Sequence, residues 1–358
     1  MDIITIVGAR PQFVKAATVS RAIQKYNTRH ENSISEKIIH TGQHYDANMS
    51  DIFFNEMDIP RPLFTLGIGG GSHGSMTGRQ LEKIEEILLE EKPDYVLVYG
   101  DTNSTLAGAL AAKKIHIPVI HVESGLRSFN MQMPEEINRI LTDQISNILF
   151  CPTESAVNNL MNEGFSDKNC HIYNVGDVMF DAAMYYSSKS VKPAPMNIKE
   201  DNFALATIHR AENTDNFDNL KNIVDALNEI NKNMPVICPL HPRTRKILSK
   251  NKLATNFKII DPIGYFEMIW LLQNCSIVLT DSGGLQKEAY FFHKPCVTLR
   301  EQTEWIELVE IKANKLAGSD YTMIVTHTDD LLKARINFQE KLYGSANAAE
   351  IIIDKIIE

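Results

Sequence analysis

Short apolar runs alternate with longer amphipathic segments along the first half of the chain. "IITIVG" (residues 3–8) is mostly apolar, and "PQFVKAATVSRAIQKY" (11–26) repeats apolar residues at helical spacing. Further apolar runs fall at 37–42, 94–101 and 118–124, and further helical patterns at 49–58, 78–92 and 103–115. Short buried strands that alternate with helices are typical of βαβ units. The pattern therefore predicts a parallel, doubly wound sheet.

The alternation begins again after residue 202. Apolar runs fall at 203–209, 235–240, 257–261, 276–281 and 295–300, and helical patterns separate them. The intervening "YYSSKSVKPAPMNIKED" (185–201) is rich in Ser, Lys and Pro, so we place a hinge within 170–200. We expect an α/β protein of two Rossmann-like domains, 1–175 and 176–345, with a terminal helix at 346–358 that packs back on the first domain. Ligands of such sheets bind beyond the carboxyl ends of the strands, so we also expect a cleft between the domains.

The composition narrows the class of protein. The 358 residues carry a net charge of −9, which argues against a broad nucleic-acid-binding surface. The five cysteines are an odd number without Cys-x-x-Cys spacing, which argues against a disulfide framework or a zinc knuckle and favours reduced thiols. The first residues lack a basic segment before their apolar run, and no apolar run reaches the roughly 20 residues of a membrane span. We expect a cytoplasmic protein that binds neither membranes nor nucleic acid.

The segment "TDSGGLQKEA" (280–289) follows an apolar run and opens a helical pattern. Gly283 and Gly284 permit close approach of a ligand to the backbone, and a helix N-terminus attracts anions. Three interpretations are open: a phosphate cradle, a plain tight turn, and a nucleophilic serine at Ser282. A nucleophile elbow requires Gly-x-Ser-x-Gly, and position 280 is Thr, so the sequence favours the phosphate cradle.

Charged residues gather after the strands of the first domain. Arg10 and Lys15 follow the first strand, Asp101 ends "VLVYGD", and Glu123 ends "PVIHVE". A carboxylate at such a strand end can be desolvated and serve as an acid or base. These residues also have structural interpretations, because Asp101 can cap the following helix, and Arg10 and Lys15 can be ordinary charges of a capped surface helix.

Two acids and an arginine follow Pro134, at "PEEINR" (134–139). Glu135 and Arg139 are the site candidates, whereas Glu135 and its neighbour Glu136 could equally be first-turn acids that suit the helix dipole. Taken alone, each acid is more often structural than catalytic.

The second domain repeats a His–Arg pattern at two strand ends. "TIHRAEN" contains His209 and Arg210, and "PLHPRTRK" contains His241. We interpret these groups as substrate or diphosphate contacts. The segment "GIGGGSHG" (67–74) contains Gly-x-Gly-x-x-Gly, but its setting favours a loop or lid over a dinucleotide site.

Taken together and in order, these segments resemble one family, the non-hydrolysing UDP-N-acetylglucosamine 2-epimerases. The resemblance covers nearly the whole chain and rests on "GARPQFVK", "HTGQHYD", "YGDTNSTLAGALAA", "HVESGLRS", "PEEINR", "FCPTE", "NVGD", "HRAEN", "HPRT", "TDSGGLQKEA" and "LREQTEW". It implies a glycosyltransferase-B-like fold and interconversion of UDP-N-acetylglucosamine and UDP-N-acetylmannosamine, without NAD or metal, for surface polysaccharide precursors such as those of lipopolysaccharide. In that family the proton at sugar carbon 2 is removed, UDP leaves, 2-acetamidoglucal stays bound, and UDP adds back. The family is usually dimeric, so the resemblance also implies a homodimer.

The resemblance assigns roles to individual residues. The family's catalytic acids fall on Asp101, Glu123 and Glu135, and its site histidine on His209. Its UDP-contacting group falls on Ser282, Gly283, Gly284 and Glu288, with Glu288 on the ribose, and Arg10 and Lys15 match cations of the cleft. We add Arg139, Arg210 and Arg300 as substrate contacts. Gln43, His44 and His241 match positions at which some members bind a second, activating UDP-sugar.

One segment departs from the commonest family pattern. Where many members have Arg in "TTERP", this chain has Trp305 in "LREQTEW". In this it resembles the branch that acts on UDP-2,3-diacetamido-2,3-dideoxy-glucuronate. A uronate carboxylate would need a cation, and Arg79, Arg127 and Arg300 are candidates. A glycosyltransferase of the same fold and a non-catalytic nucleotide-sugar sensor are the alternatives from other classes.

Overall fold

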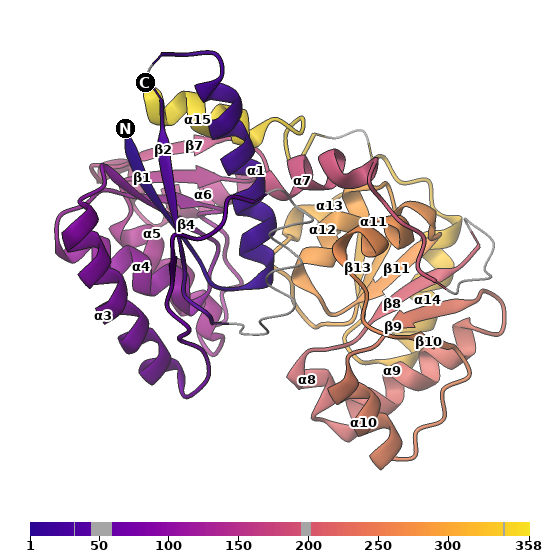
Figure 1. Ribbon diagram of the computed structural model, residues 1–358. Coiled ribbons are helices and arrows are strands. Elements are labelled where there is room, and N and C mark those ends of the chain that lie inside the picture. Colours follow the sequence, from indigo (N-terminus) through magenta and orange to yellow (C-terminus); the bar gives the residue numbers. More distant parts are fainter. Residues whose placement is uncertain (32, 44–58, 195–201, 339–340) are drawn as a thin grey trace. The chain divides into compact units, whose positions relative to one another are not determined.

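Two compact units make up the chain, and each has its own parallel sheet. The computed structural model describes residues 1–31, 33–43, 59–194, 202–338 and 341–358 (Figure 1). Unit 1 comprises Met1–Ala182 and Lys341–Glu358, and unit 2 comprises Ala183–Glu340. Every strand pair in the described ranges is parallel, which confirms the predicted α/β class.

The sheet of unit 1 has the strand order β3-β2-β1-β4-β5-β6-β7 in the described part of the chain. The strands are β1 (Asp2–Val7), β2 (Ser35–His40), β3 (Phe64–Thr65), β4 (Tyr95–Tyr99), β5 (Val119–Val122), β6 (Ile148–Cys151) and β7 (His171–Asn174). The order reverses between β1 and β4, and a reversal of this kind is where doubly wound sheets bind ligands.

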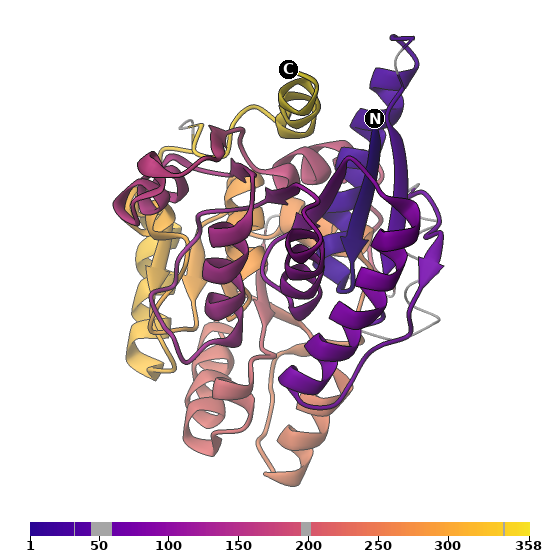
Figure 2. The same ribbon diagram turned by 90° about the vertical axis from the view of Figure 1, so that its left-hand side faces the viewer.

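Helices cover both faces of this sheet. They are α1 (Arg10–Asn27), α3 (His73–Glu91), α4 (Asn103–Lys114), α5 (Pro134–Ile145), α6 (Glu154–Asn162), the first turns of α7 (Val178–Ser187) and α15 (Ala348–Ile357), with a 3₁₀ turn at Phe165–Asp167. Apolar residues of β1, β2 and β4 pack with those of α3 and α4 in one core cluster. The C-terminal α15 packs against α1 (Figures 1 and 2).

Unit 2 has the order β10-β9-β8-β11-β12-β13 among its described residues, with the reversal between β8 and β11. The strands are β8 (Ala204–Thr207), β9 (Val236–Pro239), β10 (Lys258–Ile260), β11 (Ile277–Thr280), β12 (Cys296–Thr298) and β13 (Asn314–Leu316). The helices are α8 (Ala211–Thr214), α9 (Phe217–Ile230), α10 (Pro242–Lys250), α11 (Tyr265–Asn274), α12 (Gly283–Phe291), α13 (Ile306–Glu310) and α14 (Tyr321–Lys333). Apolar residues of α9 belong to one core cluster of this unit, and apolar residues of α11 and α12 belong to another.

The sequence pattern missed four strands, β3, β6, β7 and β13. β3, β7 and β13 contain polar or partly exposed residues, so they give no continuous apolar run, and the four-residue run of β6 is separated from α5 by only two residues. Helix α3 begins at His73, capped by the Ser72 side chain, so the end of the expected 67–74 loop is helical. The helix predicted at 49–58 lies outside the described residues.

Two features are absent from the described residues. Their helices include none that is both long enough and apolar enough to cross a membrane. Within those same residues, no three or more His, Cys, Asp or Glu side chains are grouped so that they could hold a metal ion.

Candidate active site

The predicted acids of unit 1 lie at one edge of its sheet. Asp101 lies just beyond the end of β4, Glu123 directly follows β5, and these two strands pair in register. Because the carboxyl ends of parallel strands share an edge, both side chains belong to the edge at which such sheets bind ligands.

Glu123 forms an ion pair with Lys15 of α1. Their side chains are only 10% and 8% exposed, respectively. The backbone of Glu123 has φ 69°, in the left-handed region that non-glycine residues rarely adopt. A Cβ placed on Gly100 would lie 3.2 Å from both Glu123 Oε1 and Lys15 Nζ, so the end of β4 passes directly beside the pair. Strained backbone of this kind is often found at functional sites.

Asp101 is held by Arg139. Arg139 donates to Asp101 Oδ2 at 2.6 Å and also pairs with Glu136 one helical turn away. The Asp101 side chain is 29% exposed, whereas that of Arg139 is 5% exposed. Asp101 is therefore both reachable from solvent and fixed by a buried cation.

The two neighbouring acids of α5 differ in environment. Glu136 is buried and accepts the backbone N–H groups of Ser128 and Phe129 at 3.0 and 2.8 Å, so it holds the loop before α5. Glu135, the residue named by the family resemblance, is exposed in the first turn of the helix. Of the two, only Glu135 is accessible to a ligand.

A buried ion cluster lies behind these strand ends. Asp143 Oδ1 lies 2.7 Å from His121 Nδ1, and Asp143 Oδ2 accepts from Arg127 at 2.7 Å. Glu163 accepts two further bonds from Arg127, at 2.7 and 2.8 Å. Burial acts to raise the pKa of Asp143, but the bonds from His121 and the charge of Arg127 hold that pKa below its ordinary value.

The cluster corrects one expectation. Arg127 was a candidate to bind a uronate carboxylate, but it is 2% exposed and its guanidinium already contacts two carboxylates. An arginine so engaged has no face to offer a substrate. The prediction for Arg127 is therefore wrong. Its position after a strand could not show that its side chain turns into the core.

The loop between β1 and α1 is held by Gln12. Its Oε1 accepts the backbone N–H groups of Gly8 and Ala9 at 2.8 and 3.0 Å, and its Nε2 donates to Tyr99 O. Gln43 acts similarly on α4, where its Oε1 accepts from the N–H and hydroxyl of Ser104. The Arg10 side chain and the whole of His44 lie outside the part that the structure describes.

The site residues of unit 2 are organised by a buried acid, Asp281. Its carboxylate accepts the backbone N–H groups of His209 and Arg210 and the side-chain amide of Asn213, and it lies 3.0 Å from His209 Nδ1. Burial acts to raise the pKa of Asp281, but these bonds hold it below its ordinary value. The His209 side chain is 53% exposed, so Asp281 orients a ring whose other edge is accessible.

Helix α12 begins at the glycine pair. Ser282 caps it by accepting the N–H of Leu285, which is a structural use of the hydroxyl. Glu288 lies in the second turn and is largely buried. A Cβ on Gly283 would lie 2.1 Å from Glu304 Oε1, whereas one on Gly284 would meet nothing within 4 Å. Backbone at Gly284 is thus open to a ligand, and Gly283 is packed against the protein.

Arg300 lies beside this helix N-terminus. It is 3% exposed, donates to Glu304 Oε2 at 2.9 Å, and has Glu212 at 4.0 Å. The backbone N–H groups of Gly283 and Gly284 place the positive end of the helix dipole at the end of β11, whereas the charge of Arg300 is offset by its ion pair with Glu304. The arrangement suits an anionic group such as a diphosphate.

The remaining predicted residues lie at separate places. His241 caps α10 by accepting the N–H of Arg243, and its side chain is exposed. Arg79 is exposed on α3 and donates to the carbonyl oxygens of Ser75 and Gly70. Arg210 contributes its backbone N–H to Asp281 and is half-buried.

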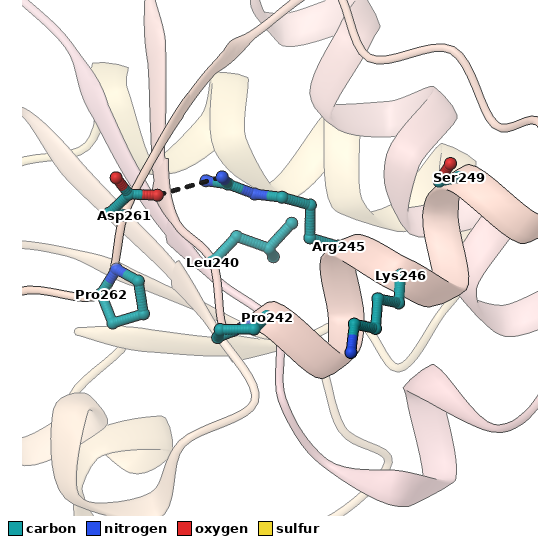
Figure 3. A pocket seen from close by; sticks show the side chains of 7 residues that line it. All are labelled: Leu240, Pro242, Arg245, Lys246, Ser249, Asp261 and Pro262. Carbon is teal, nitrogen blue, oxygen red and sulfur yellow. Dashed lines mark ion pairs between the residues drawn. The ribbon is translucent and has the colours of Figure 1, made fainter.

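A small cavity lies along α10, the helix that His241 caps (Figure 3). Its volume is about 250 Å³, and it is lined by Leu240, Pro242, Arg245, Lys246, Ser249, Asp261 and Pro262. Arg245 reaches across it to Asp261 at 3.0 Å. Sites for small molecules usually occupy about 300–1,000 Å³, so we do not assign a nucleotide sugar to this cavity.

Sequence reasoning missed the residues that hold the site in place. Asp143 and Asn213 make buried contacts with residues 18 and 68 positions away in the sequence. Glu304 accepts from Arg300 four residues away, and Glu136, which the sequence offered only as a first-turn acid, accepts the backbone N–H of Ser128 eight residues away. Asp281 belongs to the segment "TDSGGLQKEA", but the predicted contacts in that segment were Ser282 and the two glycines. A buried acid directly after an apolar strand was the available signal.

Comparisons with known proteins match nearly the whole chain to one family. The sequence profile of the family described as UDP-N-acetylglucosamine 2-epimerase matches residues 27–357. A Pseudomonas aeruginosa protein named UDP-2,3-diacetamido-2,3-dideoxy-D-glucuronate 2-epimerase is 57% identical over 99% of both chains. A Methanococcus maripaludis UDP-N-acetylglucosamine 2-epimerase is 45% identical over 98% of this chain and 96% of its own.

Solved structures match over the full length as well. The Methanocaldococcus jannaschii UDP-GlcNAc 2-epimerase in complex with UDP-GlcNAc and UDP has a TM-score of 0.90 and 42% identity, covering 100% of this chain and 99% of its own. The Neisseria meningitidis enzyme bound to UDP-GlcNAc has a TM-score of 0.87 and 32% identity, covering 100% of both chains. The resemblance found in the sequence is confirmed, and the chain belongs to the UDP-N-acetylglucosamine 2-epimerase family.

Proposed function

We propose that this protein is a nucleotide-sugar 2-epimerase that inverts carbon 2 of a UDP-N-acetylhexosamine, using neither NAD nor a metal ion. The observation that carries the proposal is a pair of carboxylates, Asp101 and Glu123, each fixed by its own cation at neighbouring strand ends. Both proton transfers at carbon 2 require groups that are held in position and can change protonation. Family membership supports the same assignment.

The two groups of site residues match the two parts of a UDP-sugar. The sugar suits the acids Asp101, Glu123 and Glu135 of unit 1. The diphosphate suits the N-terminus of α12 and the exposed edge of His209 in unit 2, and the buried Arg300, paired with Glu304, supports that helix N-terminus from the side. In the forward direction one carboxylate removes the carbon-2 proton and the carbon 1–oxygen bond breaks, so that UDP leaves with the bonding electrons and 2-acetamidoglucal forms. In the return direction a proton adds to the opposite face of carbon 2 and UDP rebinds to carbon 1.

A second substrate is favoured by a specific observation. The Pseudomonas aeruginosa relative, at 57% identity over nearly the whole chain, is named for UDP-2,3-diacetamido-2,3-dideoxy-D-glucuronate. That sugar carries a carboxylate in addition to the diphosphate. Of the three arginines considered for it, Arg127 is excluded by burial and Arg300 is paired with Glu304, whereas the guanidinium of Arg79 is exposed. We therefore propose the uronate as the alternative substrate, with Arg79 as its carboxylate contact.

A substrate panel followed by NMR in D2O tests both proposals. The protein is incubated separately with UDP-N-acetylglucosamine and with the diacetamido uronate, and formation of the manno isomer and of deuterium at carbon 2 is recorded. Epimerisation of either sugar alone supports the proposed reaction, and the faster one identifies the substrate. Absence of carbon-2 deuterium with both sugars contradicts the proposal and favours a glycosyltransferase, which needs an acceptor. An Asp101→Asn variant serves as the control for background exchange.

The family resemblance also underlies two finer proposals. We propose that the product serves surface polysaccharide synthesis and that the protein acts as a homodimer. Exposed apolar side chains support an interaction surface on unit 1, since Phe129 and Met131 precede α5, and Ile137 and Leu141 lie one turn apart on it. Light scattering of the purified protein measures the oligomeric state, and a monomer at micromolar concentration contradicts this part of the proposal.

A further inference from the structure

The ion cluster behind the strand ends has a direct connection to both acids. Asp143 Oδ2 accepts the backbone N–H of Gly125 at 3.1 Å, two residues after Glu123. His121 Nε2 lies 2.8 Å from the carbonyl oxygen of Gly100, which is the residue before Asp101. One buried carboxylate thus holds the end of β5 directly and the end of β4 through an imidazole.

Both hydrogen-bond partners of the His121 ring are acceptor oxygens. Its two ring nitrogens face Asp143 Oδ1 and Gly100 O. A backbone carbonyl oxygen can only accept a hydrogen bond, and the same is true of the Asp143 oxygen while the carboxylate is ionised. A ring protonated on both nitrogens donates to both oxygens. His121 and Asp143 are fully buried, so water does not compete for either bond.

The backbone that is held in this way is the backbone that bears the acids. Gly100 has φ 61°, and its N–H donates to Val122 O at 3.0 Å. Its Cα lies beside the Lys15–Glu123 pair, because a Cβ at this position would lie 3.2 Å from an atom of each side chain. A shift of the Gly100 carbonyl would therefore move Asp101 along the chain and disturb Glu123 through space.

We infer that His121 and Asp143 are positioning residues that set the separation and orientation of Asp101 and Glu123. Neither contacts the substrate in this scheme. The inference rests on the proposed epimerase function, because it assigns a purpose to the geometry of the two acids. Misplacement of a reacting group by about 1 Å can lower a rate on the order of 10²-fold.

Two substitutions separate the bonds of His121. In His121→Asn the side-chain amide can replace Nδ1 and still donate to Asp143, but it does not reach Gly100. In His121→Gln the amide can replace Nε2 and still donate to Gly100, but it leaves Asp143. Glu163→Gln is the matched control, because it weakens the same cluster at Arg127 without a bond to either strand end.

The measurements are kcat and KM for the UDP-sugar, the rate of carbon-2 deuterium incorporation, UDP affinity, and the fraction folded. We expect His121→Asn to lower kcat and carbon-2 exchange by on the order of 10²-fold at unchanged KM and UDP affinity. We expect His121→Gln to keep more of the activity, and Glu163→Gln to keep kcat within twofold while losing stability. If His121 only stabilised the fold, His121→Gln, which retains the bond to Gly100, would not be expected to restore kcat relative to His121→Asn.

Three results would overturn the inference. They are a folded His121→Asn variant with kcat within twofold of wild type, equal kcat for the Asn and Gln variants, and a loss confined to KM. If His121→Asn does not fold, His121→Gln must still show a lower kcat than Glu163→Gln, and equal values overturn the inference. A wild-type protein that exchanges no carbon-2 proton contradicts the proposed function instead, so the two failures are distinguishable.

Discussion

The indole Nε1 of Trp305 donates a hydrogen bond to the carbonyl oxygen of Gly283 at 2.9 Å. Trp305 is buried, and Lys287 Nζ lies 4.5 Å from the centre of its ring. Gly283 is the first residue of α12, whose N-terminus is the proposed diphosphate contact. The residue at which this chain departs from the commonest family pattern therefore fixes the start of that helix.

Trp305→Phe is expected to weaken UDP binding several-fold. Phenylalanine keeps a ring beside Lys287 but loses the donor to Gly283, and a neutral hydrogen bond contributes about 1 kcal/mol. Calorimetric titration with UDP and chemical unfolding measure the two effects. Trp270→Phe on α11 is the control, because the Trp270 ring lies under Lys192, whereas the bond to Gly283 O comes from Trp305. Equal UDP affinity in wild type and Trp305→Phe would show that the bond does not shape the anion site.

Asp281→Asn is expected to make stability less dependent on pH in the acid range. The folded-state pKa of Asp281 is lowered, so its contribution to the free energy of unfolding is fully present above the ordinary value of 3.8. That contribution is lost as the pH falls through the folded-state pKa. The difference in unfolding free energy between wild type and Asp281→Asn should therefore be largest near neutral pH and shrink below about pH 3.8.

Chemical unfolding across a pH series measures this difference. Asp225→Asn is the control, because Asp225 forms a solvent-exposed pair with Lys221 that contributes little to stability. A difference between wild type and Asp281→Asn that stays constant from neutral to acid pH would contradict the assigned role of the carboxylate.

Gly8→Ala is expected to destabilise unit 1, because an added Cβ would lie 2.1 Å from Thr41 Oγ1 and 2.2 Å from Ser104 Oγ. Those hydroxyls bond to each other at 2.7 Å, and Ser104 also bonds Gln43, so they cannot move away freely. Overpacking of this kind costs about 1–3 kcal/mol. Gly78→Ala on α3 is the matched control, since its Cβ would meet nothing within 4 Å and alanine favours a helix. Thermal unfolding should lower Tm for Gly8→Ala only, and equal shifts would refute the steric argument.

The fold could be predicted from the sequence because most of its strands are buried on both faces. β1 and β4 are mostly apolar runs in the sequence, and the helices between such strands keep a 3.6-residue period. The strands β7 and β13 are partly exposed and short, so they resemble loops in the sequence. Their pairing depends on neighbours that are distant in the chain, which a local pattern does not contain.

The site could be predicted only in part, for a related reason. Motifs indicated Asp101, Glu123 and His209 because polar residues that end apolar strands stand out in a sequence. The fate of a side chain depends on its neighbours in space, as Arg127 shows, since its partners Asp143 and Glu163 lie 16 and 36 residues away. The charge of Arg127 and its position in the sequence could not show that its guanidinium is paired with two carboxylates inside the protein.

Glu135 and Glu136 provide a matched pair of substitutions. They are adjacent in the sequence, but the helix turns about 100° per residue, so one faces outward and the other faces the core. Glu135→Gln is expected to lower kcat by about 10²-fold or more, the usual effect of losing a general acid or base, with unchanged unfolding free energy. Glu136→Gln removes the charge opposite the buried Arg139 and should cost on the order of 3 kcal/mol of stability. Steady-state kinetics and urea unfolding of both variants distinguish the roles. Normal kcat in Glu135→Gln would remove that residue from the proposed proton transfer and leave Asp101 and Glu123 as the acids to test.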